Sequence, residues 1–337
     1  MNLKSIVKIF FKATLWWLII LTILFFDMKE VNLSYVPRYD RIVAEKPKTE
    51  NINKLLEETT KDIDKLELSL KEKEKKIQEE KKRQLEAKTY LIDVVNTALD
   101  NNHYSASKYE LSYKKLCSYY KKYCKIIDIS ETEFTDKKRL YYTAITIYLI
   151  KYLKEIFPNI DNEIYYLKFQ KEKIWRRGYA GHHSIVMNIK SQMSYKQFLE
   201  VLTHEMWHIV DLWVIKGTSW WKDPNFTEFG KKVFSKDDKS LRFYKLSWNS
   251  EKIKNPYSYA KDFVSGYALT DPFEDFAETF NMYVNHNAVF IKMAKESNIL
   301  KQKYNFMNSL MKGEYLSADR KFYYKDNFRP RDSTKMK

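Results

Sequence analysis

The chain has 337 residues, 44% of them hydrophobic, which is enough for the core of one catalytic domain plus accessory segments. Glycine and proline are scarce, with 6 and 7 residues, which excludes a collagen-like chain and a long Gly/Pro-rich linker. The formal net charge of +16 is compatible with a polyanionic partner, but no nucleic-acid-binding motif stands beside it, so we expect no nucleic-acid partner.

The N-terminus has the pattern of a membrane anchor. Lys4, Lys8 and Lys12 precede an uncharged, mostly apolar run from Ala13 to Phe26. The run is shorter than the about 20 residues of a typical span, but apolar residues among the lysines extend it if the lysines reach the headgroups. A cleaved signal peptide is the alternative, although the residues after Phe26 make a poor cleavage site. We predict an anchor or signal peptide in residues 1–30, with the remainder outside the cytoplasm.

Residues 31–89 are predicted to form a helical stalk. The stretch 50–88 is dense in Glu and Lys, and a 4-3 spacing joins Ile52, Leu56, Thr59, Ile63, Leu66 and Leu70. This spacing indicates a coiled-coil seam through which the chain could self-associate. The pattern weakens after Leu70, so a single solvated helix is the alternative.

Residues 90–337 have the composition of a globular domain. Two helices are predicted over 90–99 and 140–157, and two short strands over 164–169 and 184–189. Ser194 with Gln197 can cap a helix that continues to about Val214, and Asp271-Pro272 begins another through at least Tyr283. The fold class that follows is α+β, mostly helical, with a small sheet.

The two cysteines, Cys117 and Cys124, are seven residues apart. A straight helix would hold them too far apart for a disulfide, so a disulfide requires a bend between them. Their spacing does not match a zinc-thiolate motif. The sequence leaves both the bonded and the free state open.

His204-Glu205-Met206-Trp207-His208 is an H-E-x-x-H motif. On a helix the two histidines lie on one face and can hold one zinc ion, and Glu205 is placed to serve as general base. The alternative is two structural histidines on a core helix, because an isolated match also occurs by chance. Asp211, one turn after His208, is expected either to support the site or to be solvated.

A catalytic zinc site needs a third protein ligand. One class supplies a third histidine in an H-x-x-G-x-x-H extension, but the glycine and histidine positions are Asp211 and Val214 here, so that class is excluded. Glu274 and Glu278, four apart on the later helix, are the candidates. One carboxylate can bind zinc and the other can orient a ligand histidine.

These residues together resemble the gluzincin metallopeptidases, and most closely the group that contains the anthrax lethal factor catalytic domain and the bacterial Pro-Pro endopeptidases. The resemblance rests on the H-E-x-x-H motif and on the segment from Tyr267 to Glu278, and it covers about residues 179–283. It implies a zincin-like fold, Glu274 as third zinc ligand, Glu278 as its outer partner and Tyr267 as a hydrogen-bond donor to the oxyanion. The long segment 217–256 between His208 and Glu274 departs from the pattern and leaves the shape of the cleft undetermined.

The function expected is zinc-dependent hydrolysis of peptide bonds in a protein or peptide substrate, with Glu205 as general base. The alternative is a membrane-tethered scaffold that carries a catalytically silent zincin domain, and a third is a basic protein that binds polyanions. His182 and His183 precede the strand 184–189 and could line the cleft, although structural or surface roles are the simpler interpretation. His103 and His286 have no evident partner in the sequence.

Overall fold

The computed structural model describes residues 49–100, 108–130, 133–171, 177–228, 230–317 and 329–336. Its contacts divide the chain into two compact units, Met1–Ile77 and Gln78–Lys337. The predicted membrane segment, residues 1–30, lies outside the described residues. Within those described, no helix combines the length and the hydropathy that crossing a bilayer requires.

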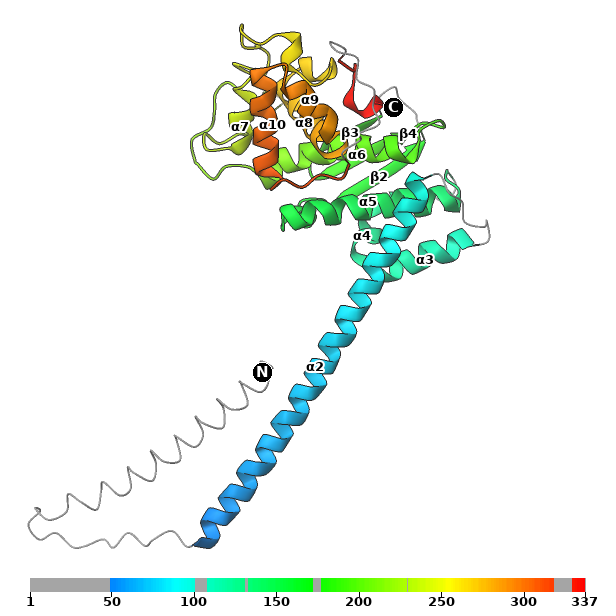
Figure 1. The fold of residues 1–337 in the computed structure, drawn as a ribbon, viewed down its shortest axis with the longest axis vertical. Helices are drawn as coiled ribbons and strands as arrows, with labels where there is room; N and C mark the ends of the chain where they lie inside the picture. Colours follow the sequence, from blue (N-terminus) through cyan, green and yellow to red (C-terminus); the bar gives the residue numbers. More distant parts are fainter. Residues whose placement is uncertain are drawn as a thin grey trace, which may run out of the picture. The chain divides into compact units, whose positions relative to one another are not determined.

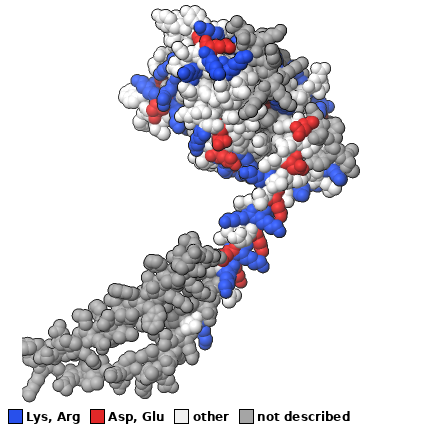
Figure 2. All heavy atoms as spheres, in the orientation of Figure 1, with Lys and Arg blue, Asp and Glu red and all other residues white. Residues whose placement is uncertain are grey.

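The helix α2 spans Thr49–Leu99, so the two helices predicted over 50–88 and 90–99 are one continuous helix. In the first unit the described seam residues Leu66 and Leu70 are exposed, and the pairing of this segment with a second copy stays a prediction. In the second unit the last turns of α2 bury Leu91 and Val94 in the core. Lysine and glutamate side chains lie interspersed along α2, and basic and acidic groups also mix on the face of the domain in view (Figure 2).

A sharp corner separates α3 (Tyr109–Tyr119) from α4 (Lys121–Ile126), because the backbone of Tyr120 leaves the helical conformation. The corner brings the Cα atoms of Cys117 and Cys124 to 5.7 Å, and the two cysteines form a disulfide. The bend that the sequence left open is therefore present.

Four short strands form one mixed sheet: β1 (Ile127–Ile129), β2 (Tyr166–Lys171), β3 (Gly178–Gly181) and β4 (Ser184–Ile189). The order is β1-β2-β4-β3; β1, β2 and β4 are parallel, whereas β3 pairs antiparallel with β4. The predicted strand 184–189 matches β4, and 164–169 is shifted by two residues in β2. The edge position beside the site belongs to β3, a strand that its composition did not predict.

The turn between β3 and β4 consists of two histidines with positive φ, 48° at His182 and 63° at His183. Side chains other than glycine, asparagine and aspartate are rare in this left-handed region. The ring of His183 lies against Tyr165 at 4.5 Å and Trp213 at 3.9 Å between centroids, and its Nδ1 lies 3.0 Å from the carbonyl oxygen of Glu163. These contacts hold His183 in a structural role, while His182 is exposed.

Three long helices form the core of the domain. α5 (Asp136–Ile156) is buried along most of its length, α6 (Tyr195–Ile209) continues into a π-helical turn (Val210–Val214), and α8 covers Pro272–Asn285. Figure 1 shows α6 between α5 and α8, with the sheet beside it. Because α6 lies between two apolar partners, most of its surface is apolar, apart from the face that carries the histidines.

Three further helices complete the C-terminal half: α7 (Lys239–Tyr244), α9 (Asn287–Ala294) and α10 (Asn298–Leu310). α7 lies within the segment 217–256, which is therefore folded into the domain. His286 is buried at the start of α9, with Nε2 3.2 Å from Oε1 of Glu200 on α6. His103 lies outside the described residues.

A fully buried ion pair links α10 to α8, because Nζ of Lys303 lies 2.7 Å from Oδ2 of Asp275. The indole N–H of Trp248 also donates to Asp275. We expect Lys303→Met to lower the free energy of unfolding by about 3–5 kcal/mol, since it leaves a buried carboxylate without its counter-charge. Urea denaturation followed by circular dichroism measures this.

The matched control is Lys301→Met, which removes a lysine from the exposed face of the same helix. Its effect should stay within about 0.5 kcal/mol. Equal stabilities for the two variants would contradict the importance of the pair.

Candidate metal centre

Helix α6 presents His204 and His208 toward α8 and packs against α8 through Trp207. The helix begins at Ser194, whose Oγ accepts a hydrogen bond from the N–H of Gln197 at 3.1 Å. Trp207, fully buried, stacks on Phe280 with centroids 3.8 Å apart and meets Phe276 edge-on at 4.9 Å. This aromatic contact fixes the position of α6 along α8. It thereby determines which carboxylates of α8 the histidines face.

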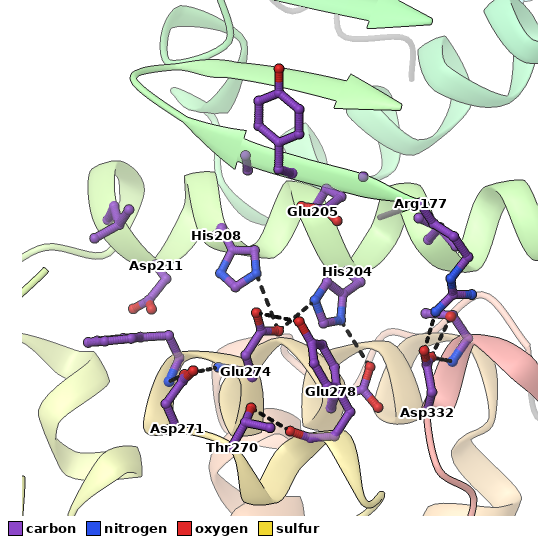
Figure 3. Close-up of a pocket in the computed structure, with 18 of the residues that line it drawn as sticks. Arg177, His204, Glu205, His208, Asp211, Thr270, Asp271, Glu274, Glu278 and Asp332 are labelled. Carbon is purple, nitrogen blue, oxygen red and sulfur yellow. Dashed lines mark hydrogen bonds and ion pairs between the residues drawn. The ribbon is translucent and has the colours of Figure 1, made fainter. Parts of the chain in front are cut away.

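Helix α8 presents Glu274 and Glu278 toward α6. Oδ1 of Asp271 caps the helix by accepting hydrogen bonds from the N–H groups of Phe273 and Glu274, and Pro272 occupies the first turn. The i, i+4 spacing then places both glutamates on one face. Figure 3 shows the two histidines projecting from α6 and the two glutamates projecting from α8 into the space between them.

The ligand atoms of His204, His208 and Glu274 lie within 4.8 Å of one another. Oε2 of Glu274 is 2.9 Å from Nε2 of His204 and 3.8 Å from Nε2 of His208. Zinc with bonds of about 2.0–2.2 Å in tetrahedral geometry separates its ligand atoms by roughly 3.4 Å, so the observed spacing suits it. Within the described ranges, no other three His, Cys, Asp or Glu side chains bring ligand atoms this close together.

The polar groups of the centre have the properties of a metal site. Oε2 of Glu274 is buried and makes no well-oriented hydrogen bond, although it faces two imidazoles. A buried carboxylate oxygen without a donor is costly, and a cation at this point would satisfy it. Two imidazole nitrogens and one carboxylate are also the donor set of several catalytic zinc sites.

An outer partner lies behind His204. Oε1 of Glu278 is 3.1 Å from Nδ1 of His204, and the Glu278 side chain is fully buried. A carboxylate at Nδ1 keeps the proton on that nitrogen and leaves Nε2 as the donor toward the metal. The structure thus brings Glu274 to both histidines and Glu278 to His204.

The pKa values of the histidines and of Glu274 reflect their burial and the charges that face them. Burial alone would lower the pKa of His204, but Glu274 and Glu278 raise it well above its usual value. Burial lowers the pKa of His208 to about 4. Burial alone would raise the pKa of Glu274, but the imidazole of His204, 2.9 Å from its Oε2, holds it at about 2. The carboxylates that favour a proton on His204 equally favour a divalent cation between the ligands.

Tyr267 reaches the same centre from a 3₁₀ turn (Tyr267–Leu269) that precedes α8. Its hydroxyl donates to Oε1 of Glu274 at 3.0 Å, and its ring lies 6.0 Å from that of His204. Burial, with the charge of Glu274, raises the pKa of the phenol, which keeps it a proton donor. The side chain is 39% exposed, so it borders the open side of the site.

Glu205 lies against the edge strand β3. A Cβ atom built on Gly178 would come within 2.7 Å of Oε1 of Glu205, so the carboxylate rests directly on the glycine backbone. Glu205, β3 and the three ligand residues line one cavity of about 1030 Å³. A substrate in this cavity would contact Glu205 and the ligand residues together.

Asp211 also lines the cavity, but its hydrogen bonds go to α7. Its carboxylate accepts from the hydroxyls of Ser240 and Tyr244, and the side chain is buried. Burial raises the pKa of Asp211 to about 8. Asp211 is therefore not solvated, and it ties the segment 217–256 to the helix that carries the histidines. His182 and His183 do not line the cavity.

Sequence comparison assigns residues 182–322 to a family described as "Putative zinc-binding metallo-peptidase". The matched range contains both histidines, Glu205 and Glu274. In the same comparisons, no curated protein and no solved structure matched the chain. With the His-His-Glu group in place, the chain carries a zinc-binding metallopeptidase domain, and zinc is its cofactor.

Proposed function

We propose that the chain is an endopeptidase that cleaves protein or peptide substrates outside the cytoplasm, with Glu205 as its general base and a site of the gluzincin type. The observation that carries this proposal is the meeting of His204, His208 and Glu274 in a cavity that also contains Glu205. When bound, zinc supplies Lewis-acid chemistry, by which it acidifies water and polarises a carbonyl.

The chain's own residues account for the remaining steps. The carboxylate of Glu205 accepts the proton of the attacking water and passes it to the departing amine. The hydroxyl of Tyr267 turns from Glu274 to donate a hydrogen bond to the oxygen that becomes negative. Glu278 holds the proton on Nδ1 of His204 throughout.

The edge strand β3 supports an extended substrate. β3 lies at the end of the described sheet, and Gly178, Tyr179 and Ala180 line the cavity. The small side chains of Gly178 and Ala180 let another backbone approach, so a substrate strand can pair with β3 and pass beside Glu205. Binding along a strand favours an endopeptidase.

The compartment is part of the proposal. The disulfide between Cys117 and Cys124 is typical of oxidising compartments, which supports a domain outside the cytoplasm. The basic and apolar start of the chain supports a membrane tether or an export signal. Self-association through residues 50–70 is a further part of the proposal.

Metal analysis of the purified chain tests the ligand set. The wild type should contain one zinc per chain, and His204→Ala and Glu274→Ala should each lose most of it, because two ligands hold zinc far more weakly than three. A library of unstructured peptides then reports internal cleavage by mass spectrometry. Full zinc retention in Glu274→Ala would contradict the third ligand, and release of terminal residues alone would contradict the endopeptidase.

A further inference from the structure

The C-terminal segment Arg329–Met336 is docked on the metal centre. The N–H of Gly266 donates to the carbonyl of Pro330 at 2.9 Å, and the N–H of Tyr267 donates to the carbonyl of Arg331 at 2.8 Å. Asp332 pairs with Arg177, the residue before β3. Figure 3 shows this pair beside Glu278. The segment therefore contacts both the tyrosine turn and the start of the edge strand.

Ser333 makes the closest link to the centre. Its backbone N–H donates to Oε2 of Glu278 at 2.7 Å, and the hydroxyl of Ser265 donates to the same oxygen at 2.5 Å. Ser333 is fully buried, so water cannot reach this position to donate to Glu278 in place of the N–H. The other oxygen, Oε1, is the one that lies 3.1 Å from Nδ1 of His204.

We propose that the backbone N–H of Ser333 is a positioning group for the zinc site. It acts through Glu278: with Oε2 held by two donors, the carboxylate can aim only Oε1 at His204, which fixes the ring and its protonated nitrogen. The inference rests on His204 as a ligand of the proposed site. It extends the functional centre beyond residue 322, where the family match ends, to a segment 55 residues after Glu278.

Proline at position 333 removes this donor, and the local backbone suits the substitution. Ser333 is the first residue of a 3₁₀ turn (Ser333–Lys335), a position that suits the fixed φ of proline. Asp332 before it is extended, with φ −158° and ψ 125°, close to the conformation that a residue before proline adopts. The proline ring replaces the hydrogen that faces Glu278, and because the N···O distance is only 2.7 Å its Cδ also pushes Oε2 out of this position.

The matched control is Ser333→Ala, which keeps the N–H. Both substitutions remove the hydroxyl, which accepts a hydrogen bond from Nδ2 of Asn281 at 2.9 Å. Any difference between the two variants therefore reports the loss of the N–H contact with Glu278, including the displacement of the carboxylate, and not the hydroxyl.

The test uses the full chain and measures zinc affinity by competition with a chelator, the visible absorption of the cobalt-substituted protein, and the melting temperature of the metal-free protein. Ser333→Pro should weaken zinc binding by about 10–100-fold and change the cobalt spectrum, as loss of an outer-shell contact does. Ser333→Ala should stay within about threefold of the wild type. Both variants should melt, without metal, within a few degrees of each other.

Equal zinc affinities for the proline and alanine variants would overturn the proposal. If Ser333→Pro does not fold, Arg177→Met serves instead, because it releases Asp332 from its ion pair. Weaker zinc binding by this variant, with an unchanged melting temperature of the metal-free protein, supports the proposal. Wild-type zinc affinity overturns it. Because zinc affinity is measured without a peptide, failure here is distinct from failure of the assigned base or substrate class.

Discussion

Replacing Glu205 by glutamine is expected to lower kcat/KM for peptide hydrolysis by about 10²–10⁴-fold, because the amide cannot accept the proton of the attacking water. Zinc content should not change, since the three ligand atoms belong to His204, His208 and Glu274. The measurement is a continuous peptide-cleavage assay together with metal analysis of the same preparation.

The matched control is Glu228→Gln. Glu228 lines the same cavity, and burial raises the pKa of its carboxyl to about 7, but it is not part of the ligand group. This variant should keep activity within a few-fold of the wild type. Loss of zinc from Glu205→Gln, or substantial residual activity with zinc bound, would reject Glu205 as the base.

Adding one methyl group at Gly178 should lower kcat by about 10²-fold, the cost of moving a catalytic group by roughly 1 Å. The Cβ of Gly178→Ala would come within 2.7 Å of Oε1 and 2.9 Å of Cγ of Glu205. The carboxylate would have to move, whereas none of the ligand atoms is among the nearest atoms that the new Cβ would meet. We therefore expect the loss in kcat with zinc affinity unchanged.

Gly181→Ala is the control for this change. Gly181 lies on the same strand β3, and a Cβ there would meet nothing within 4 Å. It should leave kcat within about twofold of the wild type, and both variants should fold, as thermal denaturation would show. Equal activities for the two alanine variants would mean that Glu205 is free to shift away from β3.

The spacing from which the sequence predicts the metal centre is local. The i, i+4 spacing of His204 and His208 and of Glu274 and Glu278 needs only a helix, and capping residues at Ser194 and Asp271 marked where each helix begins. The buried contact of Trp207 with α8, which sets the register that brings the two pairs together, could not be read from spacing.

The rest of the site depends on contacts between distant segments. β3, with the sequence Gly-Tyr-Ala-Gly, carries no strand signal, and only its pairing with β4 makes it a strand. The hydrogen bond from Ser333 to Glu278 joins residues 55 apart and has no motif. Asp211 was placed near the site by its spacing, but its bonds to Ser240 and Tyr244 required the fold of the long segment between His208 and Glu274.

The turn between β3 and β4 has a consequence for how this domain tolerates change. An Asn-Gly pair would suit its two left-handed residues better than His182-His183, so the turn is not optimised for its own conformation. What holds it is the imidazole of His183, wedged between Tyr165 and Trp213. Relatives should therefore vary freely at position 182 and little at position 183. Without the contacts of His183, the strand β3 that Glu205 rests on would lose its fixed position.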